Sequence, residues 1–243
     1  MSPPLFLVPD LPDIPDLPDV ATVRLDGPEG HHAANVQRLR IGERVVLADG
    51  RGTLAPGVVA AVEKGALAVH LESRSFEEPP DPRLTVVQGI AKGDRGELAV
   101  QAMTEVGVDA IVPWQAARSI ARWRDERPVE RWRATVREAA KQARRAWLPP
   151  VSGARTTAQV LASLPAFALV LDESAERRLS SVELPPAGDI ALVVGPEGGI
   201  APEELAAFAA AGALPVRLGS SILRTSTAGV AAISALSVRL GRW

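Results

Sequence analysis

Apolar positions follow two different patterns along the chain, and the change falls near residue 80. Up to about Leu71, short apolar runs alternate with polar positions and glycine turns, as in antiparallel strands. We expect one helix there, at His31–Leu39, and tight turns at Asp49-Gly50 and Lys64-Gly65. The expected strands are Leu5–Val8, Ala21–Leu25, Arg44–Leu47, Val58–Val62 and Leu67–Leu71. Short strands at this spacing predict a small β-barrel.

Two proline-rich stretches interrupt the apolar pattern. Asp10–Asp19 has proline at every third position, which sets φ repeatedly and favours an extended surface loop. Ser73–Arg83 is polar and also rich in proline, and the pattern differs on its two sides. We therefore expect two domains, residues 1–73 and 84–243, joined by a linker at 74–83.

After the linker, continuous apolar runs alternate with helical periodicity. The expected strands are Leu84–Ile90, Ala110–Trp114, Phe167–Asp172, Ile190–Val194 and Val216–Leu218. The expected helices are Asp94–Val106, Pro128–Ala146, Pro202–Ala211 and Ser226–Leu240. Continuous apolar strands between helices predict an α/β domain with a parallel sheet that is covered on both faces. Because ligands of such sheets bind beyond the carboxyl ends of the strands, the loops after Leu171, Val194 and Leu218 are the places for a site.

Composition excludes several kinds of site. The chain has no cysteine, so disulfides, thiolate metal sites and a cysteine nucleophile are excluded. Three histidines, two of them adjacent, make a histidine-rich metal site a poor expectation, and we expect no metal. No apolar run reaches the roughly 18–20 residues of a membrane helix, and no basic flank precedes an apolar N-terminal stretch. We expect a cytoplasmic enzyme.

Positive charge is concentrated in one stretch, although the formal net charge is -2. Residues 118–155 carry ten arginines and Lys141 against four acids, whereas residues 1–30 carry six acids against Arg24. Arginine presents a planar fork that fits phosphate and stacks on bases, so the stretch indicates contact with nucleic acid. The alternative is a solvated helix face.

Two loops have the composition of a ligand site. Gly195-Pro-Glu-Gly-Gly199 follows an expected strand, and its glycines let backbone amides approach a ligand, although a plain tight turn is the alternative. Leu218–Ala228 follows the next strand, and Thr225 or Ser226 is expected to cap the last helix. A capped core helix is the alternative there. Arg224, in a strand-to-helix loop beside a glycine loop, favours an anionic or polar ligand.

Together the two loops resemble the RsmE-type ribosomal RNA uridine-N3 methyltransferases of the SPOUT class. Val194-Gly-Pro-Glu-Gly-Gly-Ile200 and Leu218-Gly-Ser-Ser-Ile-Leu-Arg-Thr-Ser-Thr-Ala228 carry the most specific match. The resemblance extends through nearly the whole chain in order. The further matching positions are Lys92, Thr104-Glu-Val-Gly107, Pro113, Arg118-Ser119, Gln142, Arg145 and Pro149, and, in the N-terminal part, His31-His32, Val36, Arg38, Gly42 and Asp49-Gly50.

The resemblance implies a trefoil-knotted SPOUT domain after a small PUA-like β-barrel, a homodimer, and S-adenosyl-L-methionine as cofactor without a metal. The implied substrate is one uridine of 16S rRNA in the assembled small ribosomal subunit. The implied cofactor-binding residues are Leu171, Glu173, Gly195, Pro196, Glu197, Gly198, Gly199, Leu218, Gly219, Ile222, Leu223, Arg224, Thr227 and Ala228. The candidates for RNA contact are His32, Arg38, Lys92, Arg118, Ser119, Arg122, Gln142 and Arg145. For His32, packing on the barrel is an equal alternative.

Arg224 is the expected catalytic residue. Uridine N3 has a lone pair available only after proton loss, and a nearby cation stabilises the negative charge on the base oxygens. Two positions depart from the family pattern. Ser226 stands where many relatives have an acid, which excludes a carboxylate base there, and Ala201 stands where many have a capping Ser or Thr. Loss of this helix cap should lower stability by about 1 kcal/mol, which Pro202 partly offsets.

Two alternatives remain open. One is a different SPOUT enzyme that acts on a ribose 2′-oxygen or on tRNA, against which the N-terminal barrel and Arg118-Ser119 argue by resemblance. The other is a catalytically silent protein that binds rRNA or assists assembly, against which the two intact loops argue.

Overall fold

The computed structural model describes residues 2–11 and 21–243, which form two compact units. The first unit comprises Met1–Pro79 together with Ala140–Leu148, and the second comprises Pro80–Ala139 together with Pro149–Trp243. The division falls inside the proline-rich stretch that sequence patterning marks, but nothing in the pattern indicates that Ala140–Leu148 joins the first unit. Most of the expected surface loop Asp10–Asp19 lies outside the described residues.

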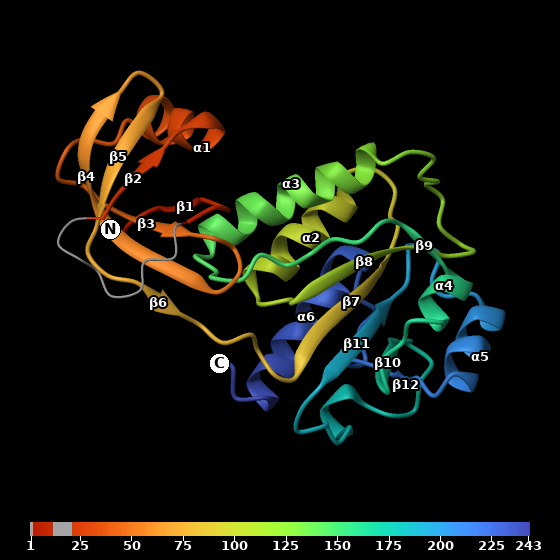
Figure 1. The fold of residues 1–243 in the computed structure, drawn as a ribbon. Coiled ribbons are helices and arrows are strands. Elements are labelled where there is room, and N and C mark those ends of the chain that lie inside the picture. Colours follow the sequence, from red (N-terminus) through yellow and green to blue (C-terminus); the bar gives the residue numbers. More distant parts are fainter. Residues whose placement is uncertain (1, 12–20) are drawn as a thin grey trace. The chain divides into compact units, whose positions relative to one another are not determined.

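The first unit is built on a curled, mixed sheet of six strands, drawn in red to orange in Figure 1. Its order is β1-β3-β4-β5-β2, with β6 paired to β4. The β1–β3 pair is parallel and the other pairs are antiparallel. The strands are β1 (Leu5–Leu7), β2 (Thr22–Leu25), β3 (Arg44–Ala48), β4 (Thr53–Glu63), β5 (Ala66–Leu71) and β6 (Ser75–Phe76).

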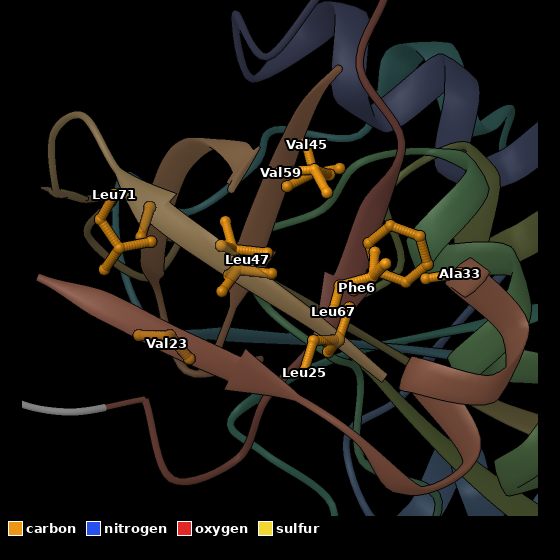
Figure 2. Close-up of a cluster of buried hydrophobic side chains, with 11 residues drawn as sticks. Phe6, Val23, Leu25, Ala33, Val45, Leu47, Val59, Leu67 and Leu71 are labelled. Atoms are coloured by element: carbon orange, nitrogen blue, oxygen red, sulfur yellow. The ribbon is translucent and has the colours of Figure 1, made fainter. Parts of the chain in front are cut away.

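Alternate side chains of these strands meet in one apolar core. Figure 2 shows Phe6, Leu47 and Leu67 gathered in this cluster, and all three are fully buried. The period-two pattern in the sequence arises because successive strand side chains point to opposite faces and only one face is buried here. The five expected strands are therefore confirmed, with β4 extending to Thr53 at its start.

The helix expected at His31–Leu39 is wrong in position. The helix α1 (Gly27–His31) begins four residues earlier, with Pro28 in its first turn, and continues as a wider helical turn through His32–Val36. Gly30 lies inside α1. A glycine is needed there because a Cβ would sit 2.4 Å from the carbonyl oxygen of Leu25. Glycine marks a close backbone approach at this position and does not end a helix.

The second unit is an α/β domain with an all-parallel sheet of six strands. The sheet order is β12-β10-β11-β7-β8-β9, so strands far apart in sequence become neighbours. The strands are β7 (Arg83–Gly89), β8 (Ala110–Gln115), β9 (Arg155–Thr156), β10 (Phe167–Leu171), β11 (Asp189–Val194) and β12 (Leu214–Val216). The expected parallel α/β architecture is confirmed.

Helices pack on both faces of this sheet. The helices are α2 (Arg95–Glu105), α3 (Arg127–Gln142), α4 (Thr157–Leu161), α5 (Pro202–Ala210) and α6 (Thr225–Arg239). The helix α6 contacts α2, β7 and β11, whereas α4 and α5 contact each other and strands of the sheet. Phe208 of α5 and Val160 of α4 join strand residues such as Val193 in a single core. Burial on both faces explains why the strands appear as continuous apolar runs.

Two elements in the second unit have other bounds than expected, and one helix was missed. The helix α3 ends at Gln142 instead of Ala146, and Arg144 takes a left-handed conformation with φ 54°. The strand β12 lies two residues before the expected range, because an edge strand tolerates Pro215. The helix α4 was not expected, although Thr156 and Gln159 form a capping box that signals it.

The order of helices and strands does not by itself test every expectation from the resemblance. The trefoil knot stays a prediction. Within residues 2–11 and 21–243, no helix is long and apolar enough to cross a membrane. The same residues contain no group of three or more histidines and acids that would hold a metal ion.

Candidate functional site

A cavity of about 810 Å³ lies in the second unit where β10, β11 and β12 end. Its size falls within the roughly 300–1,000 Å³ of small-molecule sites. It is formed by the segments that follow the three strands, the start of α6, and two arginines from other segments. The lining residues are Arg95, Arg118, Leu171–Ser174, Val194–Ile200, Val216–Thr225 and Ala228. The carboxyl ends of the strands therefore hold the site, as the parallel sheet predicts.

The glycine-rich loop Gly195–Gly199 forms one wall of the cavity. A tight turn closes it, in which the amide of Gly199, at φ 72°, donates to the carbonyl oxygen of Pro196 across 2.9 Å. The loop lies directly against the end of β7, because a Cβ on Gly89 would sit 2.5 Å from the nitrogen of Pro196. Gly89 is thus a further residue that shapes the site, and local sequence reasoning did not single it out.

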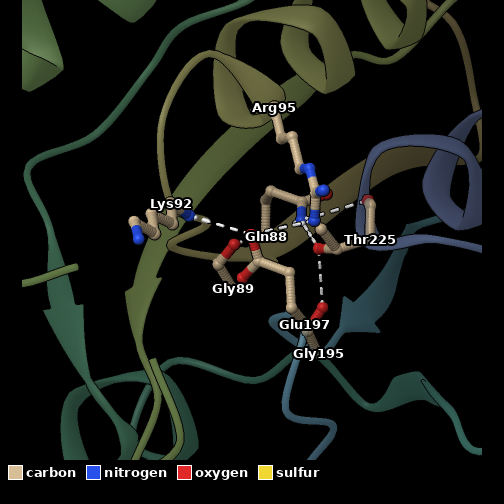
Figure 3. A network of polar contacts seen from close by, with 7 residues as sticks. All are labelled: Gln88, Gly89, Lys92, Arg95, Gly195, Glu197 and Thr225. Carbon is tan, nitrogen blue, oxygen red and sulfur yellow. Dashed lines mark hydrogen bonds and ion pairs between the residues drawn. The ribbon is translucent and has the colours of Figure 1, made fainter. Parts of the chain in front are cut away.

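Glu197 fastens this loop to the segment before α2. Its Oε1 accepts from the backbone amide of Lys92 at 2.9 Å and lies 3.8 Å from Nη1 of Arg95 (Figure 3). The Glu197 side chain is only 17% exposed, so these contacts are partly shielded from water. Glu197 therefore connects the glycine loop to the segment before α2, and its Oε1 already accepts a hydrogen bond.

Arg118 lies against the outer side of the glycine loop. Its Nη1 donates to the carbonyl oxygens of Gly198 at 3.2 Å and Ile200 at 3.5 Å. The residue before it is held by Glu204, whose Oε1 accepts from the amide of Ala117 at 2.9 Å. The predicted RNA contact at Arg118 is therefore also a wall of the cavity.

Glu204 is a buried anchor behind this wall. Besides Ala117, its Oε1 accepts from the hydroxyl of Thr157 at 2.6 Å, and its Oε2 accepts from the amide of Ala201 at 3.4 Å. The second contact engages the backbone amide of the residue before α5, while Ala201 itself supplies no side-chain cap, as expected. Buried hydrogen-bonded carboxylates of this kind hold segments in register.

The loop from Arg217 to Arg224 forms the opposite wall and ends in α6. Arg224 is the residue before the helix, with φ -68° and ψ 155°, and its carbonyl oxygen accepts from the amides of Thr227 and Ala228. Arg224 lines the cavity, and its guanidinium makes no hydrogen bond or ion pair with the described residues. This exposed cation is available to a ligand.

The expectation that Thr225 or Ser226 caps α6 is wrong. Both residues lie inside the helix, at its first two positions, and the residue before it makes no side-chain cap. The Thr225 hydroxyl instead donates to the carbonyl oxygen of Gly195 at 2.7 Å. Ser226 is buried and does not line the cavity.

The structure brings thirteen of the fourteen predicted cofactor residues to this one cavity, and Thr227 is the exception. The predicted RNA contacts are divided between the units. His32, Arg38, Gln142 and Arg145 belong to the first unit, whereas Lys92, Arg118, Ser119 and Arg122 belong to the second. The ring of His32 lies 6.4 Å from that of Phe6, centroid to centroid, which supports the packing alternative for this histidine.

The cavity fits a nucleoside that carries a charged tail. Backbone edges of two glycine-bearing loops face it, and a Cβ on Gly219 would meet no atom within 4 Å, so a ligand has open space there. Leu171, Ile222 and Leu223 supply apolar surface, and both acidic and basic side chains stand around it. Such a lining suits a cofactor with a flat aromatic base, a polar sugar and a zwitterionic end.

Comparison with known proteins agrees with this geometry. Residues 77–237 match the family described as RNA methyltransferase domain, and residues 25–72 match the RNA methyltransferase PUA domain. The chain is 46% identical over 232 residues to ribosomal RNA small subunit methyltransferase E of Mycobacterium bovis. The alignment covers 92% of this chain and 88% of that protein.

Two solved structures resemble the fold over almost its whole length. The crystal structure of ribosomal RNA small subunit methyltransferase E from Neisseria gonorrhoeae, bound to S-adenosylmethionine, has a TM-score of 0.87 at 30% identity. A methyltransferase of Legionella pneumophila in complex with the same cofactor has a TM-score of 0.85 at 25% identity. Each comparison covers 98% of both chains.

Proposed function

This chain belongs to the ribosomal RNA small subunit methyltransferase E family, and from this we propose that it methylates N3 of a uridine in 16S rRNA, with S-adenosylmethionine as the methyl donor. The observation that carries the proposal is the convergence of the two glycine-bearing loops and Arg224 on one cavity at the strand ends. Neither loop forms a site alone, and the sheet order brings them together.

The chain's own residues have a positioning task. When bound, the cofactor would supply a methyl group carried on a sulfonium. In an in-line displacement the methyl–sulfur bond would break, and the rest of the cofactor would leave as a neutral thioether. Gly195–Gly199 and Leu218–Leu223 line the cavity and would hold the cofactor, and alignment of the reacting atoms supplies much of the rate. No metal is needed for this reaction.

Arg224 is the proposed catalytic residue. Uracil that has lost the N3 proton carries negative charge on its two oxygens, and the unpaired guanidinium at the cavity stabilises that charge. Ser226 does not line the cavity and is buried, which argues against a role in accepting the proton.

The first unit and the arginine-rich stretch are proposed to bind the rRNA. Arg38, Lys92, Arg122, Gln142 and Arg145 are the proposed contacts, together with Arg118 at the cavity. Ser119 is only 5% exposed and its hydroxyl is buried, which argues against its predicted contact with RNA. Arg38 has φ 55°, a conformation that few side chains adopt, and it follows the helical turn of the first unit. We further propose that the enzyme works in the cytoplasm as a homodimer.

The test is methyl transfer to defined substrates. Small ribosomal subunits from a strain that lacks the gene are incubated with the purified protein and labelled S-adenosylmethionine. Mass spectrometry of the rRNA should then locate one methyl group on N3 of a single uridine. A methyl group on ribose, or labelling of tRNA alone, favours a different SPOUT enzyme, and failure to bind the cofactor favours a silent rRNA-binding protein.

A further inference from the structure

The hydroxyl of Thr225 joins three segments that are distant in sequence. It donates to the carbonyl oxygen of Gly195 at 2.7 Å and accepts from Nε2 of Gln88 at 3.0 Å. Figure 3 shows Thr225 at the start of α6, with Gln88 from β7 and Gly195 from the glycine loop near it. One side-chain oxygen thus connects the central strand β7, the glycine loop and the start of α6.

Gln88 lies in the protein interior, where its side chain has no contact with solvent. It is 0% exposed, and its Nε2 also donates to the carbonyl oxygen of Gly89 at 3.2 Å. Buried polar groups are costly without partners, and here only Nε2 has them, because Oε1 of Gln88 is buried without a hydrogen-bond partner. The adjacent Gly89 packs against the Gly195–Pro196 peptide, whose carbonyl oxygen is the one that Thr225 holds.

Arg224 precedes Thr225 directly, so the position of its backbone depends on the same contacts. Thr225 is 7% exposed and has little freedom to move while both of its hydrogen bonds are intact. Gly195 and Arg224 both line the cavity. A single buried hydroxyl, that of Thr225, therefore connects the glycine loop at Gly195 with Arg224.

From this geometry we propose that Gln88 and Thr225 are positioning residues, which hold the Gly195 wall and Arg224 in one fixed arrangement for methyl transfer. The inference rests on the proposed function and deepens it, because neither residue is assigned a role by the cofactor or RNA contacts above. A displacement of about 1 Å at a reacting centre costs up to about 100-fold in rate, so loss of this connection should reduce the rate of transfer.

The main variant is Thr225→Val, which keeps the shape and removes the hydroxyl. At saturating cofactor and subunit, its single-turnover rate should fall about tenfold or more, whereas Thr225→Ser, which keeps the hydroxyl, should stay within about threefold of wild type. Thr104→Val is the matched control, because Thr104 is fully buried in α2 and its hydroxyl donates to Val100 of its own helix. The control should lower the thermal midpoint without lowering the rate of the folded protein.

Gln88→Met is the second variant and guards against a failure of Thr225→Val to fold. It removes Nε2 but leaves the Thr225–Gly195 hydrogen bond, so a smaller loss of rate is expected than for Thr225→Val. The single-turnover rate of the double variant should be within about twofold of that of Thr225→Val, because the two residues act through one connection. Losses that multiply would overturn the idea of a single connection.

Hydrogen exchange of the cofactor-free chain provides a readout that is independent of activity. In Thr225→Val, amides of Gly195–Gly199 and of the first turn of α6 should exchange faster than in the Thr104→Val control. If exchange there is unchanged and the rate equals wild type, Thr225 does not position the site. If wild type itself methylates nothing, the proposed function is overturned, and with it the role in transfer. Exchange then still decides whether the hydroxyl holds the loops together.

Discussion

Nη1 of Arg118 donates to the carbonyl oxygen of Gly198 across 3.2 Å, which joins the segment after β8 to the glycine-rich loop. The two segments are also packed closely, because a Cβ on Gly198 would lie 3.2 Å from Cβ of Arg118. An arginine expected from sequence to contact RNA therefore also supports the wall of the cofactor cavity.

Arg118→Ala should weaken S-adenosylmethionine binding by about tenfold, because a charged hydrogen bond that holds the loop is lost. Isothermal titration calorimetry measures the affinity. Arg122→Ala is the control, since Arg122 does not line the cavity and makes only a 3.5 Å contact to the carbonyl oxygen of Ala117. Equal affinities for wild type and Arg118→Ala would show that the loop holds its shape without this contact.

Gly219→Val should abolish cofactor binding while the protein stays folded. A Cβ at Gly219 meets nothing within 4 Å, so the fold accepts the side chain, which then occupies space of the cavity. At Gly195 a Cβ would lie 2.9 Å from Cγ1 of Ile200, so Gly195→Val should both weaken binding and lower the thermal midpoint. Calorimetry and thermal unfolding distinguish the two. Full binding by Gly219→Val would remove this residue from the site.

Arg224→Ala should slow single-turnover methylation by about 100-fold or more, as removal of a preorganised charge stabiliser does. Ser226→Ala should stay within about tenfold of wild type, because Ser226 is buried away from the cavity and is not a general base at neutral pH. Both rates are measured on purified subunits at saturating cofactor. An inactive Ser226→Ala beside an active Arg224→Ala would reverse the assignment of roles.

Replacing Arg122 and Arg145 by alanine should weaken binding to the small subunit and flatten its dependence on salt. Each lost phosphate contact should reduce the slope of log affinity against log salt by roughly 0.7–0.9. Filter binding across a range of salt concentrations measures the slope. If the slope is unaltered, these arginines belong to a solvated surface.

The free protein should be a dimer in dilute solution. Val238 in the last turn of α6, Ile222 before it and Trp243 after it are all more than half exposed, and apolar side chains of this size are commonly buried in an interface. Light scattering should give a mass near twice the 25.6 kDa of one chain. A mass of one chain at all micromolar concentrations contradicts the dimer.

Local patterns in the sequence determine most of the elements. Apolar alternation predicts β2, β3 and β5, and continuous apolar runs predict β7, β8, β10 and β11, because burial on one or two faces sets those periods directly. Glycine marks the stop after α2 at Gly107, with φ 99°, since few other residues adopt that conformation. The glycine-rich loop was evident because three glycines in five residues leave the backbone open to a ligand.

Resemblance to a family, and not periodicity, supplied the cofactor and the substrate. Arg224 was a candidate already from its place in a strand-to-helix loop beside a glycine loop. Periodicity reports which face of an element is buried, but it says nothing of what a loop binds. It also misplaced α1, which begins at Gly27 and includes Gly30 at a close approach to the backbone of Leu25.

Only the tertiary structure decided what surrounds the site. The sheet order places the end of β7 beside the loop after β11, although about 105 residues separate Lys92 from Glu197. Gln88 and Thr225 meet across 137 residues, and no local pattern carries such a pairing. A side chain's partner depends on which strands become neighbours, and that is settled by the packing of the whole sheet and its helices. The sequence therefore identifies each loop separately, whereas the cavity forms only when the packed strands bring the loops together.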